Sequence, residues 1–133
     1  DSPENADPRW SETPRDDLSY EVMVPDVLFQ PHSAPLNIAF YEADQFGPEY
    51  SGDAFVAMHG SWNRGRRTGY KVVQLDFDEN GEPTGTYTDF MTGFVVDAAN
   101  VWGRPVGVAV GPDGSLYVSE DGSGTIWKVS RAN

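Results

Sequence analysis

Short apolar segments alternate with turn residues along most of this chain, and no stretch keeps a helical period. From residue 36 onwards, seven segments rich in β-branched and aromatic residues are bounded by Gly, Pro, Asn or Asp, which is typical of strands. Strands are expected at 36–41, 54–58, 70–77, 84–90, 106–110, 115–119 and 125–130. Asn80-Gly81 and Asp113-Gly114 mark tight hairpin turns. The pattern predicts an all-β, antiparallel protein.

Part of this strand pattern occurs twice. The segment APLNIAF at 34–40 aligns with RPVGVAV at 104–110, DAFVAMHGS with GSLYVSEDG, and GYKVVQL with GTIWKVS. Another β-like segment precedes each repeat, the first within residues 20–30 and the second around TDFMTGF. Four-stranded sheets that take their outer strand from a neighbouring segment are the units of a β-propeller. We therefore expect two four-stranded sheets, with Pro25 placing residues 20–30 at an edge.

The composition limits the partners and sets the N-terminus apart. The chain has 133 residues, enough for one domain, and no cysteine, which excludes disulfides and thiolate metal sites. Its 21 acidic and 9 basic residues give a net charge of -12, which argues against a nucleic-acid partner. No stretch is long and apolar enough to span a membrane.

Residues 1–19 differ from the rest of the chain. They are acidic and contain Pro and Ser with little to bury, so an extended or disordered arm is expected ahead of the sheets in residues 20–133. The sequence begins at Asp1, and no signal peptide is expected within it. The chain is therefore expected to be a processed product or a piece of something longer.

The densest functional-group chemistry lies between the predicted strands 54–58 and 70–77. This loop contains His59, Trp62, Asn63, Arg64, Arg66 and Arg67. Such positive charge on an acidic chain indicates an anion-facing site. Alternatively, the arginines only balance the surface field or bind a neighbouring chain. A histidine after a strand is often a structural hydrogen-bonding residue, and a tryptophan often only packs.

Five segments share the motifs of a known family. They read HSAPLNIAFY at 32–41, GDAFVAMHGSWNR at 52–64, GYKVV at 69–73, DFMTGFV at 89–95 and WGRPVGVAVGPDGSLYVSEDGSGTIWKVS at 102–130. The chain resembles the C-terminal part of the glucose/sorbosone dehydrogenase family of soluble quinoproteins. The resemblance implies a six-bladed β-propeller that oxidises a sugar, polyol or aldehyde with pyrroloquinoline quinone (PQQ), commonly with calcium. It also implies a periplasmic or secreted location.

The same resemblance indicates residues that face the cofactor. Arg104 is the leading candidate, and Asn63 or Arg64 falls where the family has a second cofactor-facing cation. A guanidinium suits this position because PQQ has three carboxylates. Trp102 is expected to form an aromatic wall against the planar ring. The remaining candidates in the matched segments are Trp62, His59 and His32.

The metal ligands and the general base of the family lie in earlier blades that this chain does not contain. One local motif, DFDENG at 76–81, copies the first six positions of a calcium loop. Its twelfth position is Tyr87 rather than the bidentate Glu that calcium requires. A hairpin turn explains the same residues, so no metal ligand is assigned in this chain.

Two functions of different classes remain open at this point. The chain is either the C-terminal blades of a quinoprotein dehydrogenase, incomplete without the other blades, or a non-catalytic propeller module for binding or assembly. Two blades leave unpaired edges and apolar faces and cannot close a ring. Three self-associating copies would supply six blades. The rival expectation is that the missing blades belong to a longer chain.

Overall fold

Two antiparallel sheets form the part of the chain that the computed structural model describes, residues 23–132. The first sheet contains, in order, β1 (Pro35–Phe40), β2 (Ala54–Met58), β3 (Lys71–Phe77) and β4 (Pro83–Met91). The second contains β5 (Pro105–Val110), β6 (Leu116–Glu120) and β7 (Thr125–Val129). Apart from the short 3-10 helix η2 (Pro48–Tyr50), no helix occurs in the described residues. The all-β prediction is confirmed, whereas the arm at 1–19 lies outside the described residues.

The fourth strand of the first sheet comes after the other three strands in the sequence, not before them. β4 was expected as the outer strand of the second sheet, but it pairs with β3, with Leu75 opposite Tyr87. The tight turn at 78–82 returns the chain at once, because the Asp78 carboxylate accepts hydrogen bonds from the N–H groups of Asn80 (2.9 Å) and Glu82 (2.8 Å). The described residues therefore form one four-stranded and one three-stranded sheet.

Residues 23–30 of the expected edge strand cover a sheet face instead of pairing. Val27 and Phe29 pack on the apolar cluster of the first sheet, and the Phe29 ring meets Tyr87 edge to face at 5.1 Å. Pro25 has no N–H to donate to a strand ladder. Residues 20–22 of this expected strand lie outside the described residues.

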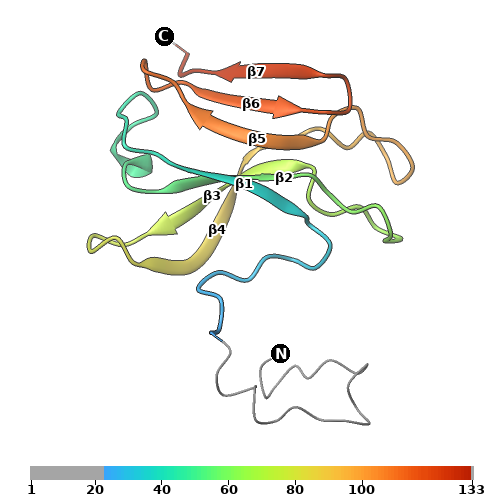
Figure 1. Cartoon of the computed structure of the whole chain (residues 1–133), viewed down its shortest axis with the longest axis horizontal. Coiled ribbons are helices and arrows are strands. Elements are labelled where there is room, and N and C mark those ends of the chain that lie inside the picture. Colours follow the sequence, from blue (N-terminus) through green and yellow to red (C-terminus); the bar gives the residue numbers. More distant parts are fainter. Residues whose placement is uncertain (1–22, 133) are drawn as a thin grey trace.

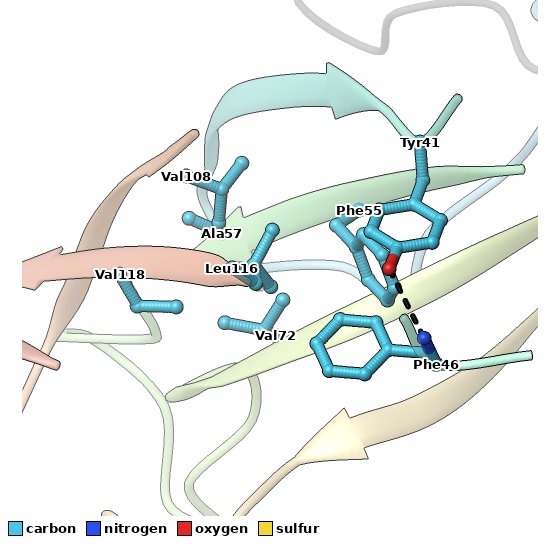
Figure 2. Close-up of a cluster of buried hydrophobic side chains, with 8 residues drawn as sticks. All are labelled: Tyr41, Phe46, Phe55, Ala57, Val72, Val108, Leu116 and Val118. Carbon is cyan, nitrogen blue, oxygen red and sulfur yellow. Dashed lines mark hydrogen bonds between the residues drawn. The ribbon is translucent and has the colours of Figure 1, made fainter. Parts of the chain in front are cut away.

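A shared core joins the two sheets, with β5 lying against β1 and β2 (Figure 1). Figure 2 shows the buried side chains of this core, which are Tyr41, Phe46, Phe55, Ala57, Val72, Val108, Leu116 and Val118. The Tyr41 hydroxyl accepts a hydrogen bond from the Phe46 N–H (3.1 Å) and donates to the Gly114 carbonyl (2.9 Å). Since each fully buried aliphatic or aromatic side chain contributes about 1.5–3 kcal/mol, this core fixes the two sheets against each other.

Strand pairing defines how the two repeats correspond. Ile38 pairs with Val56 as Val108 pairs with Val118, and both β1 and β5 have a register irregularity after their first residue. β1 and β5 align as the sequence predicts. β2 aligns with β6 one residue later in β6 than the sequence alignment gives. His59 therefore corresponds to Asp121 rather than to Glu120. Backbone hydrogen bonds support this correspondence, because the His59 N–H donates to the Ala34 carbonyl and the Asp121 N–H donates to the equivalent Arg104 carbonyl.

Candidate functional site

Three polar side chains meet where β2 and β6 end and β5 begins, on the right in Figure 1. Oδ1 of Asp121 lies 3.1 Å from His59 Nε2. The same oxygen accepts a hydrogen bond from Arg104 Nε at 2.8 Å. Two of the predicted residues are thus brought together by a carboxylate that was not predicted.

The neighbours of Asp121 keep it ionised. Partial burial acts to raise its pKa, but the hydrogen bond from His59 and the positive charges of His59 and Arg104 outweigh this and lower the pKa below its ordinary value. The side chains stay open, since Arg104 is 42% and Asp121 49% exposed. Exposed ion pairs add little stability. The effect of this pair is therefore to orient the guanidinium and the imidazole at the surface.

A buried carboxylate, Glu120, organises the turn behind this cluster. Its Oε2 accepts hydrogen bonds from the N–H groups of Gly122 (2.7 Å) and Arg104 (3.3 Å). Its Oε1 accepts from the Ser123 hydroxyl (2.5 Å) and the Thr125 N–H (3.1 Å). The Ser123 hydroxyl is the largest of the causes that lower the pKa of Glu120 to about 2. Glu120 thus links the start of β5 to the turn after β6.

The loop between β2 and β3 is fixed at its base by close backbone approach. Gly69 has φ +73°, and a Cβ there would lie 2.6 Å from the Ser33 carbonyl oxygen and 2.7 Å from Gly60 Cα. Only glycine tolerates this position. The hydroxyl of the buried Tyr70 also donates to the Ser61 carbonyl. The base of the loop is therefore rigid, although its tip is exposed.

Arg67 connects this loop to the loop between β4 and β5. Its guanidinium donates to the carbonyl oxygens of Ala98 (3.1 Å), Ala99 (3.0 Å) and Ser61 (3.1 Å) and to the Tyr70 hydroxyl (3.1 Å). Both loops extend to the same side of the molecule (Figure 1). Arg67 thus clamps together the two loops that flank the cluster.

Trp102 lies in the loop before β5 with its ring fixed and part of it open. The indole Nε1 donates to the Gly93 carbonyl at 2.7 Å. The ring contacts Phe94 (centroids 4.9 Å apart) and Trp127 (5.7 Å). Because 43% of Trp102 remains exposed, a planar ligand has access to it.

The other predicted residues lie outside the cluster. Trp62 is 89% exposed, and Asn63 is exposed. Arg64 Nη1 donates to the Pro31 carbonyl at 3.0 Å, and the exposed His32 occupies the same turn. Arg104 instead donates to Asp121, so these two predicted cations have separate partners.

Asp121 and Glu120 are the residues that sequence reasoning missed. Aligning the repeats by sequence sets His59 against Glu120, whereas the strand register sets it against Asp121. The available signal was the acidic pair in SEDG directly after a strand, at nearly the place that His59 has in the other repeat.

No group of three or more His, Cys, Asp or Glu side chains in the described ranges is placed to hold a metal ion. The expected hairpin at Asn80-Gly81 is present, with Asp78 bonded to the turn's N–H groups. None of the helices described is long and apolar enough to cross a membrane.

Comparison with known proteins decides the family. The model described as TrAA12-like matches residues 8–132, nearly the whole chain. The chain belongs to the TrAA12-like family. This TrAA12-like chain is 37% identical over 107 residues to a protein from Borreliella burgdorferi, covering 80% of this chain and 28% of that protein. It is 35% identical over 124 residues to a pyrroloquinoline quinone-dependent pyranose dehydrogenase from Coprinopsis cinerea, covering 80% of this chain and 16% of that protein.

A solved structure supports the same relationship. The TrAA12-like chain is similar to the holo form of the pyranose dehydrogenase PQQ domain from Coprinopsis cinerea, with 32% identity and a TM-score of 0.67. The match covers 86% of this chain and 31% of that chain. The predicted fold class of propeller blades and the relationship to PQQ-dependent sugar dehydrogenases are confirmed. The chain spans less than a third of the length of these relatives.

Proposed function

We propose that this chain supplies the C-terminal blades of a PQQ-dependent sugar dehydrogenase, and that Arg104 binds the cofactor. The supporting observation is that Asp121 orients the Arg104 guanidinium beside His59 at an open end of the strands. In the described residues Arg104 donates only through Nε and its backbone N–H. Both Nη groups are therefore available to a carboxylate, which a guanidinium can bind through two hydrogen bonds.

The residues present fit part of such a site. PQQ carries three carboxylates on a planar ring and, when bound, supplies the two-electron oxidant. Arg104 would bind and orient a carboxylate, and Trp102 would limit the position of the ring. Because the ionised Asp121 only accepts hydrogen bonds, His59 donates to it through Nε2–H.

The exposed face of β1 indicates where other blades would pack. Leu36, Ile38 and Phe40 are 54%, 48% and 54% exposed. By strand register, Ile38 corresponds to Val108, which is buried against the first sheet. If a preceding blade packed on β1 as the first sheet packs on β5, the aromatic-bearing face of that blade would cover Ile38. Those blades come from further copies of the chain, with a trimer completing six, or from a longer protein.

Light scattering on the purified chain separates these two sources of blades. A mass near three times 14.6 kDa supports a trimeric ring. A monomer, or a polydisperse aggregate, contradicts the ring and favours blades from a longer chain. The substrate in either case would be a small sugar or aldehyde, and the periplasmic or secreted location expected from the family resemblance belongs to the same proposal.

Titration with PQQ tests the cofactor role of Arg104. The absorption spectrum of PQQ is followed while wild-type chain, Arg104→Gln or the control Arg131→Gln is added. Arg131 is exposed beyond the opposite end of β7. Losing a charge-assisted hydrogen bond costs roughly 1.5–3 kcal/mol, so Arg104→Gln should bind at least tenfold more weakly, while Arg131→Gln should match the wild type. Unchanged PQQ absorption would leave the non-catalytic module as the better function.

A further inference from the structure

A second polar site lies beside the proposed cofactor site, where β3 begins and β4 ends. It is a groove of about 380 Å³ between the β2–β3 loop and the start of the β4–β5 loop. Arg64, Arg66, Arg67 and Lys71, four of the nine basic residues of the chain, line this groove with one carboxylate, Asp89. On a chain of net charge -12, this concentration of cations attracts anions locally.

Two of the cations have donors available for a ligand. Arg67 directs its guanidinium to neutral oxygens, and Lys71 pairs with Asp89 at 2.5 Å. Arg64 uses only Nη1, and Arg66 donates to no residue within the described range 23–132. The carbonyl groups around Arg67 do not cancel its charge. Arg64 and Arg66 are therefore the binding groups, and Arg67 adds a fixed positive charge next to them.

The size and polarity of the groove define the class of ligand. Its volume of about 380 Å³ falls in the range of organic-ligand sites and exceeds what a single inorganic ion fills. Gln30 Nε2 and the exposed Thr92 hydroxyl add neutral polar groups to the wall, whereas the Thr68 hydroxyl donates to Gln30 Oε1 at 2.6 Å. Val95 is the one aliphatic residue of the wall, and the buried Tyr70 is its one aromatic residue. Such a wall suits a polyhydroxylated anion better than an aromatic or lipid-like one.

We infer that this groove binds a carboxylated sugar unit, with the carboxylate on Arg66 and Arg64 and the hydroxyl groups on Gln30 and Thr92. The choice of an anion rests on the groove alone, whereas the choice of a sugar rests on the proposed function. The β2–β3 loop connects the two sites, since it begins at His59 and contains both arginines. Acidic sugars are therefore the ligand class that we assign to this groove.

Calorimetric titration of the full chain with trigalacturonate tests the inference without any cofactor. Wild-type chain should bind trigalacturonate and should bind its methyl ester at least tenfold more weakly. Arg66→Gln should lose about tenfold or more in affinity, as expected for a lost charge-assisted hydrogen bond. Arg131→Gln, another exposed arginine, should bind within twofold of the wild type. Raising the salt concentration should weaken binding to the wild type.

Four results would overturn the inference. They are the absence of binding to trigalacturonate at millimolar concentration, equal binding of the methyl ester, an unchanged affinity in Arg66→Gln, and displacement by sulfate at the same concentration as trigalacturonate. The last result would identify a general anion site without sugar selectivity. Because PQQ is absent from this titration and Arg104 is unaltered, its failure is distinguishable from failure of the proposed cofactor role.

Discussion

Replacing Glu120 with glutamine tests how the turn behind the candidate site is held. The carboxylate accepts hydrogen bonds from two kinds of donor, namely the backbone N–H groups of Arg104, Gly122, Ser123 and Thr125 and the Ser123 hydroxyl. Glutamine keeps one oxygen but places an NH2 group against these donors. A fall in the Glu120 pKa from 4.5 to about 2 corresponds to roughly 3 kcal/mol of stability as an upper value.

The sign of the pH dependence follows from the direction of this shift. Since folding lowers the pKa of Glu120, its stabilisation is fully present above pH 4.5 and is lost as the pH falls toward 2. Glu120→Gln should therefore lower the free energy of unfolding by about 2–3 kcal/mol at pH 6. The deficit relative to wild type should shrink between pH 4.5 and pH 2.

Urea unfolding followed by tryptophan fluorescence at pH 6, 4 and 3 measures this deficit. The control is Glu79→Gln, because Glu79 is exposed and the substitution removes a similar charge. The control should stay within about 0.5 kcal/mol of wild type. A Glu120→Gln deficit that is the same at all three pH values, or no deficit at pH 6, would refute the assigned hydrogen bonds.

Two further substitutions test the loop base and the core. Gly69→Ala should lower the free energy of unfolding by roughly 3 kcal/mol or more, because of the positive φ and the approach to Ser33 and Gly60. The control Gly65→Ala should be nearly neutral in thermal melts, because a Cβ there meets nothing within 4 Å. Equal melting temperatures of the two variants would contradict the close approach at Gly69. Tyr41→Phe should lower the free energy of unfolding by about 1–3 kcal/mol, because the N–H of Phe46 and the carbonyl of Gly114 lose their partner. A loss in urea unfolding no larger than that of Tyr117→Phe would argue against these two hydrogen bonds.

The strands could be predicted from the sequence because their signal is local. Alternating apolar residues between Gly- and Asp-containing turns mark β1, β5 and β6 within a residue or two. The partner of β4 could not be predicted, because a strand such as PTGTYTDFM has no feature that selects one neighbour. The short turn capped by Asp78 makes that choice.

The candidate site could be predicted only in part, because its decisive contacts are long-range. Family motifs identify Arg104 and His59, but the bridge between His59 and Asp121 joins residues 62 positions apart. It depends on a one-residue register that backbone pairing determines. Arg64 and Arg104 are both predicted to face the cofactor. Their hydrogen-bond partners, the Pro31 carbonyl and Asp121, depend on loop conformations that residue types do not reveal.

The central claim, that Arg104 held by Asp121 binds PQQ, is tested most directly by a crystal structure of the full chain soaked with PQQ. The account predicts a cofactor carboxylate at hydrogen-bond distance from the Nη atoms of Arg104, with the planar ring beside Trp102 and the bond from Arg104 Nε to Asp121 retained. A structure in which PQQ occupies only the groove at Arg66, or binds away from Arg104 altogether, would contradict the claim.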